Sequence, residues 1–136
     1  MKLNVGCGLA AVGYMTAIFL LSSTPGNFAP TSRLVLKLLH LPLFAGLAAC
    51  LLLGLTQGAW YQTGSWRLYG VVALLAGGYA AFDEWHQSFV PGRSARVGDF
   101  LLDCVGIGLL LAVHRLMTRE GRGWRSTQRH ETGSTG

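Results

Sequence analysis

Four apolar runs constrain most strongly what this chain can fold into. They cover residues 5–22, 38–55, 68–82 and 100–117, and the first of them contains no charged residue. A helix of about 20 apolar residues is long enough to cross a hydrocarbon core about 30 Å thick. The sequence therefore predicts an all-α fold, an integral membrane bundle of four transmembrane helices.

The composition and the N-terminal run agree with this class. Only 12% of the 136 residues are charged, whereas about a quarter are charged in soluble domains. The first run is longer than the apolar stretch of about 7 to 15 residues in a signal peptide, and no A-x-A site follows it. We therefore expect an uncleaved helix there instead of a cleaved signal peptide.

Several functional classes find no support in the sequence. Cys7, Cys50 and Cys104 lie within apolar runs and lack C-x-x-C spacing, which argues against a disulfide framework or a zinc site. Nothing matches the short motifs of classical serine hydrolases, zinc proteases or nucleotide-driven pumps. The net charge of +5 comes without the aromatic-basic pattern of nucleic-acid binders. We expect membrane lipids as partners of the arginines, and no nucleic acid.

The distribution of basic residues predicts the orientation. Four spans place both termini on one side of the membrane, and seven of the 11 Lys and Arg residues lie on that side. Because the side richer in Lys and Arg is normally cytoplasmic, both termini are expected to be cytoplasmic. Residues 1–117 then form one membrane domain, and the Gly-, Ser- and Arg-rich segment 118–136 is expected to be a basic disordered cytoplasmic tail.

Polar residues gather at the span ends that this orientation places at the outer leaflet. His40 opens the second span, Asp83 and Glu84 close the third, and Asp99 and Asp103 open the fourth. A charged residue within the membrane costs about 2.5 to 3.5 kcal/mol on insertion scales, so such side chains face the bundle interior or a wet pocket. We expect them to meet in one place.

Helical spacing places further polar residues on the same stripes. Asp83 precedes His86 by three residues and Gln87 by four, and Asp99 precedes Asp103 by four. Small residues at the same spacing are expected to bring the third and fourth spans into close contact with their neighbours. They are Ala73, Gly77 and Ala81 in the third span and Cys104, Gly108 and Ala112 in the fourth.

Two segments beside the spans carry turn or amphipathic signals. Pro91-Gly92 predicts a tight turn within a short outer-face hairpin, residues 88–98, which dips Phe89 and Val90 toward lipid and holds Arg93 over the acids. Residues 31–39 form an amphipathic pattern that is expected to lie in the outer interface. Pro42 is then expected to kink or restart the second span.

These residues resemble the VanZ-like family of small membrane proteins. The resemblance rests on Asp83-Glu84 with Gln87, on Pro91-Gly92-Arg93, and on Asp99 and Gly106. Two earlier blocks are also similar to that family's motifs, and the resemblance covers nearly all of residues 14–112. These blocks are Ser22, Ser23 and Pro25, and Lys37, His40 and Phe44.

Three positions depart from the family pattern. Leu36 occupies a position that often holds an acid, Arg96 one that usually holds a small hydroxyl residue, and Asp103 one that usually holds asparagine. The resemblance implies a multi-pass protein of the bacterial cytoplasmic (inner) membrane with a role in the cell envelope. The founding member is associated with resistance to the glycopeptide antibiotic teicoplanin.

The polar residues form a candidate functional cluster with two readings. In the first, Asp83, Glu84 and Arg93 form an ion-pair network that locks the hairpin onto the bundle. In the second, Arg93 and Arg96 receive a phosphate or carboxylate of an amphiphilic ligand, while an acid or His86 does acid-base work or holds a cation. The cluster comprises His40, Asp83, Glu84, His86, Gln87, Arg93, Arg96, Asp99 and Asp103.

The sequence leaves three functional hypotheses. The first is an envelope protein that binds an amphiphilic ligand at the outer leaflet and lowers susceptibility to teicoplanin-type glycopeptides. The second is a membrane enzyme acting on a lipid-linked phosphate or cell-wall precursor, and the third is an assembly factor without catalysis. Carboxylates and histidines make a Mg²⁺ or Mn²⁺ site conceivable, but we assign no metal and no cofactor.

Overall fold

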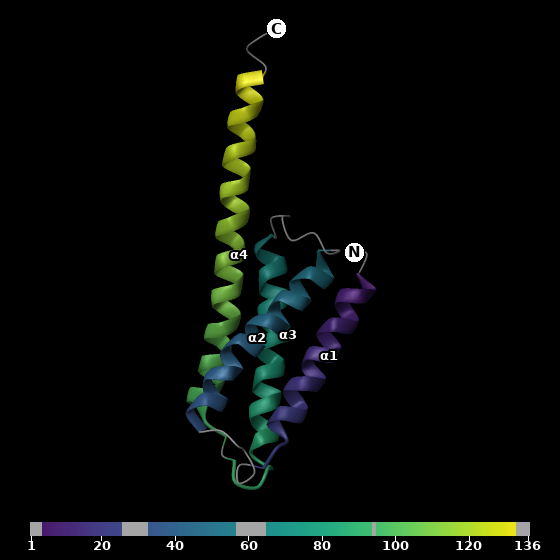
Figure 1. Ribbon diagram of the computed structural model, residues 1–136, viewed down its shortest axis with the longest axis vertical. Helices are drawn as coiled ribbons and strands as arrows, with labels where there is room; N and C mark the ends of the chain where they lie inside the picture. Colours follow the sequence, from purple (N-terminus) through teal and green to yellow (C-terminus); the bar gives the residue numbers. More distant parts are fainter. Residues whose placement is uncertain (1–3, 26–32, 57–64, 94, 133–136) are drawn as a thin grey trace.

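A computed structural model of the chain describes residues 4–25, 33–56, 65–93 and 95–132. These residues form four helices, α1 (Val5–Ser22), α2 (Arg33–Leu55), α3 (Trp66–Gln87) and α4 (Val97–Thr132). Successive helices run antiparallel, so α1 begins and α4 ends at the same end of the molecule (Figure 1). The expected all-α fold is confirmed, and α1 coincides with the first apolar run.

Polar side chains cap the N-termini of two of the helices. The Asn4 side chain accepts a hydrogen bond from the Cys7 backbone N–H at 3.2 Å, and the Ser65 hydroxyl accepts one from Leu68 N–H at 3.3 Å. Each satisfies a backbone donor that the first turn of a helix leaves without an internal partner. Asp99 lies in the first turn of α4, where the helix dipole favours a negative charge.

Helices α2 and α3 form the centre of the bundle. Each of them contacts the other three helices, whereas α1 and α4 lie on opposite sides and make no contact with each other within the described residues (Figure 1). The buried core is built largely from α2 and α3. Its members are Ala11, Ile18, Phe44, Leu47, Ala48, Leu52, Val72, Ala76, Ala80 and Ile107.

A glycine allows α4 to approach α2 closely. A Cβ at Gly106 would meet the backbone of Leu41, lying 3.2 Å from its carbonyl carbon and 3.3 Å from its Cα. Backbone atoms of a packed helix have little room to move aside. Glycine at this position therefore sets the separation of the two helices.

Four of the six small residues expected to mediate helix contacts are exposed, and Gly77 and Cys104 are only partly buried, so the prediction that these stripes face the neighbouring helices is wrong. Ala73 and Ala81 are exposed on α3, and Gly108 is exposed on α4. A Cβ at Gly77 or Gly108 would meet no neighbouring atom within 4 Å. The inward faces carry other residues, namely Val72, Ala76 and Ala80 on α3 and Asp103, Gly106 and Ile107 on α4.

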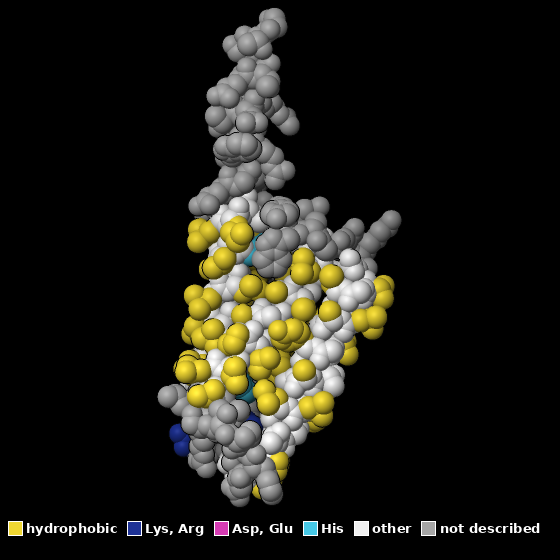
Figure 2. Space-filling model, viewed as in Figure 1, with side chains coloured by type: hydrophobic (Ala, Val, Ile, Leu, Met, Phe, Trp, Pro, Cys, Tyr) yellow, Lys and Arg dark blue, Asp and Glu magenta, His cyan; other side chains and the backbone are white. Residues whose placement is uncertain are grey.

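Three segments are long and apolar enough to cross a membrane: Val5–Ser22, Leu38–Leu55 and Val97–Thr118. Large apolar side chains face outward along the helices (Figure 2), with Leu9 68% exposed on α1 and Leu74 75% exposed on α3. Soluble monomers rarely expose large continuous apolar patches. These features indicate a membrane protein.

The bounds of three helices differ from the expected segments. Helix α2 begins at Arg33 and continues through Pro42 without a restart. Helix α3 extends to Gln87, so Asp83 and Glu84 lie inside the helix. Helix α4 continues to Thr132, through most of a segment that was expected to be disordered. Adding a residue to an existing helix costs far less than starting a new one, which favours such extension.

Candidate functional site

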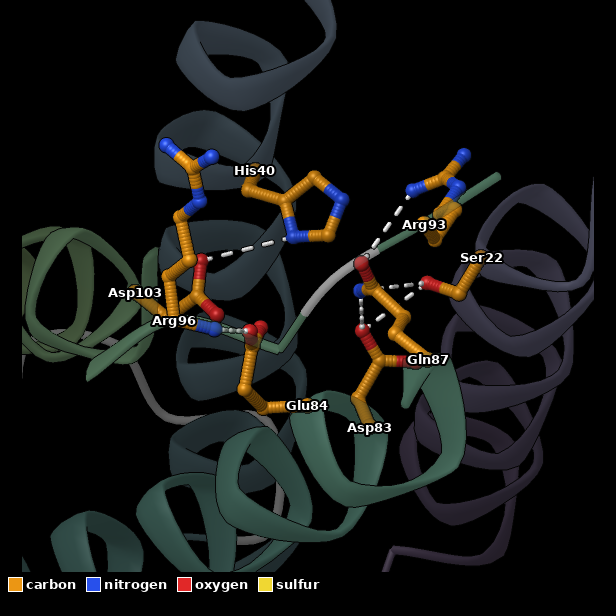
Figure 3. Close-up of polar contacts among 8 residues, drawn as sticks. All are labelled: Ser22, His40, Asp83, Glu84, Gln87, Arg93, Arg96 and Asp103. Atoms are coloured by element: carbon orange, nitrogen blue, oxygen red, sulfur yellow. Dashed lines mark hydrogen bonds and ion pairs between the residues drawn. The ribbon is translucent and has the colours of Figure 1, made fainter. Parts of the chain in front are cut away.

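The candidate site lies at the end of the bundle where α1 and α3 end and α2 and α4 begin (Figures 1 and 3). Side chains from all four helices and from the α3–α4 connection meet there. Asp83 and Asp103 are each only 1% exposed. The other buried polar side chains at this end are Ser22, His40, Glu84 and Gln87.

Asp83 on α3 is the centre of a compact hydrogen-bonded group. Its Oδ2 accepts hydrogen bonds from the Ser22 hydroxyl and from Gln87 Nε2, both at 2.8 Å. Gln87 Nε2 also donates to the Ser22 oxygen at 3.3 Å. The expected stripe of Asp83 and Gln87 on one face of α3 is thus present, and Ser22 ties it to the last turn of α1 (Figure 3).

Arg93 binds backbone carbonyls, and this corrects the expected ion pair with the acids. Its Nε donates to Thr24 O and its Nη2 to Leu21 O, both at 3.1 Å, while Nη1 donates to Gln87 Oε1 at 3.2 Å. Within the described residues its guanidinium forms no ion pair with Asp83 or Glu84. A helix end in an apolar environment leaves carbonyls that need donors, and the planar five-donor guanidinium meets several of them together.

A tight turn holds Arg93 in this position. The Arg93 backbone N–H donates to Val90 O at 3.1 Å across Pro91 and Gly92. Gly92 has a φ of 77°, as glycine at the third position of a type II turn requires, with proline before it. The expected Pro91-Gly92 turn is therefore present, and Phe89 just before it is exposed.

Glu84 joins the α3–α4 connection to the site. Its Oε1 accepts a hydrogen bond from the Arg96 backbone N–H. Asp83, Asp99 and Asp103 all lie close enough to Glu84 to interact with it electrostatically. Four carboxylates from α3 and α4 therefore share one end of the bundle.

His40 and Asp103 connect α2 to α4. His40 Nδ1 lies 3.5 Å from Asp103 Oδ1 (Figure 3), which is an ion-pair distance when the imidazole is protonated. The two residues are 63 positions apart in the sequence, and both are buried. Asp103 thus forms a specific contact with His40, which belongs to one of the early sequence blocks that carry the resemblance.

Two buried carboxylate oxygens lack a hydrogen-bond donor within the described residues. They are Asp83 Oδ1 and Asp103 Oδ1. Leaving a buried acceptor unsatisfied costs about 1 to 3 kcal/mol, and more when the group is charged. Such atoms are uncommon in native structures and call for an explanation such as an absent water, ion or ligand.

His86 and the metal hypothesis fit the site less well. The His86 ring lies against Phe19 of α1, with 4.4 Å between ring centroids, and its Nδ1 has no hydrogen-bond partner in the described part of the chain. The same part contains no group of three His, Cys, Asp or Glu residues placed to hold a metal ion. The described residues of the site therefore provide carboxylate hydrogen-bond acceptors but do not form a set of metal ligands.

Ser22 and two carbonyls at and just after the end of α1, those of Leu21 and Thr24, were absent from the expected functional cluster. Ser22 had a weak signal, because it belongs to one of the early blocks of the resemblance and ends an apolar run. The carbonyls of Leu21 and Thr24 had none, because a backbone acceptor has no signature in the sequence. The interaction of Arg93 with them follows only from the path of the α3–α4 connection.

The chain matches the family model described as VanZ/LLP1 over residues 9–118. The chain belongs to the VanZ/LLP1 family. The matched region contains every residue of the expected cluster, from His40 to Asp103, and the resemblance inferred from the sequence is confirmed. No curated protein and no solved structure matches this VanZ/LLP1 chain.

Proposed function

We propose that this VanZ/LLP1 protein binds the polar head of an amphiphilic ligand at the outer leaflet of the bacterial inner membrane, and thereby lowers susceptibility to teicoplanin-type glycopeptides. The observation that carries the proposal is the pair of buried carboxylate oxygens without donors, Asp83 Oδ1 and Asp103 Oδ1. Family membership supports the link to resistance.

The proposed topology has four spans with cytoplasmic termini. Helix α2 ends at the opposite end of the bundle from the start of α4, so the chain must return between them, and α3 has 22 residues with which to do so. The excess of Lys and Arg on the terminal side supports cytoplasmic termini. The site then lies on the outer side.

Exposed aromatic residues support an interfacial depth for the site. Trp85 and Phe89 are both largely exposed, and their ring centroids lie 5.1 Å apart. Trp85 also contacts the ring of Phe82 at 5.8 Å. Tryptophan is enriched where hydrocarbon meets the head groups, so this end of α3 suits a ligand with its head in that layer.

We favour binding over catalysis on a lipid-linked phosphate. An enzyme of that kind needs cationic donors that face the phosphate. The Arg93 guanidinium is engaged by two backbone carbonyls and Gln87 instead. Turnover of a lipid-linked precursor by the purified protein would contradict this choice.

Asp83→Asn and Asp103→Asn test the proposal against the assembly-factor alternative. Both replacements keep the side-chain shape and remove the charge. In a teicoplanin-challenged host that carries the gene as its only copy, we expect normal protein abundance and susceptibility equal to that of the deletion strain. Tyr69→Phe is the control, because Tyr69 binds His114 at the opposite end of the bundle, at 2.9 Å, and should leave resistance unchanged. Resistance that persists in both aspartate variants contradicts the proposal.

A further inference from the structure

We infer that the head group received by this site carries an ammonium group with N–H donors, so that its nitrogen and not its phosphate is recognised by Asp83 and Asp103. This inference rests on the proposed function, because it specifies the chemistry of the same ligand. The ammonium can belong to an aminophospholipid or to a free amine. The experiment below separates these two sources.

The first step is the chemical character of the two carboxylate oxygens that lack a donor. Asp83 Oδ1 and Asp103 Oδ1 are acceptors, and both belong to side chains that are 1% exposed. An acceptor of this kind is satisfied by a donor. A phosphate oxygen is itself an acceptor and would leave both carboxylate oxygens unpaired.

The second step is that the main cation beside Asp83 is already used. Nε, Nη1 and Nη2 of Arg93 donate to Thr24 O, Gln87 Oε1 and Leu21 O. On the α4 side, His40 Nδ1 lies 3.5 Å from Asp103 Oδ1, an ion-pair distance without hydrogen-bond geometry. Within the described residues, no donor therefore makes a hydrogen bond to either oxygen.

The third step is the charge at this end of the bundle. Asp83, Glu84, Asp99 and Asp103 are four of the six acids of the whole chain, and the three aspartates all lie close enough to Glu84 to interact with it electrostatically. Among the side chains described at this end, these four carboxylates outnumber the guanidiniums of Arg93 and Arg96; the side chains of Arg33 and Lys37, in the first two turns of α2, lie outside the described part of the chain. In a partly dehydrated site, closely spaced carboxylates attract a cation and repel a phosphate anion.

An ammonium group fits these three conditions. It is a compact cation with three donors and no acceptor, so it can pair with several carboxylate oxygens at once. A trimethylated nitrogen carries the same charge without any N–H. Comparing a ligand that carries the ammonium with one that carries the trimethylated nitrogen therefore separates the effect of hydrogen bonding from the effect of charge.

Native mass spectrometry of the purified chain supplies the test. Phosphatidylethanolamine and phosphatidylcholine share the phosphate and differ in the N–H donors, and phosphatidylglycerol lacks the nitrogen. We expect phosphatidylethanolamine to bind at least tenfold more tightly than either of the others. Asp83→Asn and Asp103→Asn should each remove that preference, while Tyr69→Phe retains it. Equal binding of the three lipids, or preference for phosphatidylglycerol, overturns the inference.

A second arm identifies the source of the amine. Ethanolamine is added to the protein in phosphatidylcholine nanodiscs, with tetramethylammonium as the matched cation, and the midpoint of thermal unfolding is measured. Stabilisation by ethanolamine alone, abolished in Asp83→Asn, supports a free amine. A lipid preference without it supports a lipid head group. Stabilisation that follows pH alone, with neither the ethanolamine effect nor the lipid preference, indicates that a carboxyl proton satisfies these oxygens and overturns the inference.

The two proposals fail in different ways. If the aspartate variants lose resistance while the wild-type protein does not distinguish phosphatidylethanolamine from phosphatidylcholine, the ammonium inference is wrong and the proposed function stands. If the lipid preference is present and depends on Asp83 and Asp103 while both variants keep resistance, the ammonium site stands and the proposed function is wrong.

Discussion

At the scale of single residues, the site depends on how donors are divided between acceptors. Asp83 has one oxygen with two donors and one oxygen with none among the described residues. Arg93 directs its donors to carbonyls and leaves the acids to other groups. An arginine near acids in sequence is therefore a poor guide to an ion pair when a helix end competes for the same donors.

Adjacent serines test the Asp83 group. Ser22→Ala removes a 2.8 Å hydrogen bond to a buried carboxylate, so we expect the free energy of unfolding to fall by about 1 to 3 kcal/mol. Ser23→Ala is the matched control, because the Ser23 hydroxyl binds Phe19 O within its own helix. Reversible unfolding in mixed micelles measures both. Equal losses for the two serines would show that the contact with Asp83 contributes nothing.

Arg93→Lys tests the geometry of the guanidinium. Lysine keeps the charge but cannot reach Leu21 O, Thr24 O and Gln87 Oε1 together, so we expect a loss of about 1 to 3 kcal/mol in unfolding free energy. Arg67→Lys is the control, because Arg67 is exposed and lies over the Trp66 ring at 5.6 Å. If the Arg93→Lys protein is as stable as the wild type, Arg93 contributes to stability only through its charge.

At the scale of helices, two stripes of small residues compete for the inward position on α3. Ala73, Gly77 and Ala81 have the same four-residue spacing as Val72, Ala76 and Ala80, only one position away. Nearly every face of α3 is apolar, so periodicity alone does not select one. Asp83 identifies the inward face of α3, because it continues the Val72–Ala76–Ala80 stripe at helical spacing and is buried.

The same reasoning applies to α4 and marks the limit of sequence reading. Asp103, Ile107 and His114 lie on one helical face, and all three are buried. The polar residues could thus have been used to orient both helices, and the meeting of His40, Glu84 and Asp103 at one end was predicted. The backbone contact at Gly106 was not predictable, because helix separation depends on three-dimensional packing that spacing does not encode.

Two glycines on α4 test this packing. Gly106→Ala places a methyl group against the Leu41 backbone, and we expect a loss of about 1 to 3 kcal/mol in unfolding free energy from overpacking. Gly108→Ala adds the same methyl where nothing lies within 4 Å, and helix propensity predicts a gain of up to about 1 kcal/mol in water. The two variants should shift the unfolding midpoint in opposite directions. A neutral Gly106→Ala would contradict close α2–α4 packing.

At the scale of the whole molecule, buried polar contacts occur toward both ends of the bundle. The Tyr69–His114 contact lies toward the end where α1 begins, and the candidate site lies at the other. Apolar residues dominate the outer surface between them (Figure 2). The apolar surface and the polar residues at the site end were predicted, since apolar runs and the polar residues at their ends are directly readable, whereas the Tyr69–His114 contact was not.

Cysteine labelling tests the proposed topology. With Cys7, Cys50 and Cys104 replaced by alanine, Ala95→Cys should react with a membrane-impermeant maleimide in intact cells, because residue 95 is exposed at the site end. Trp66→Cys is the counterpart at the start of α3, where Trp66 is 75% exposed. It should react only after the cells are opened. Labelling of both from one side would show that α3 does not cross.

The capping of α1 by Arg93 has a consequence for biosynthesis. Leu21 O and Thr24 O accept hydrogen bonds from a residue that is 72 and 69 positions later in the chain, respectively, and Leu21 O also accepts one from the Thr24 backbone N–H at 3.3 Å. While the ribosome is still extending the nascent polypeptide, Thr24 O has no donor from Arg93 and must be solvated by water or lipid head groups. The first helix can enter the bilayer early, but its last turn acquires its final partner only after the segment leading into the last helix has been translated.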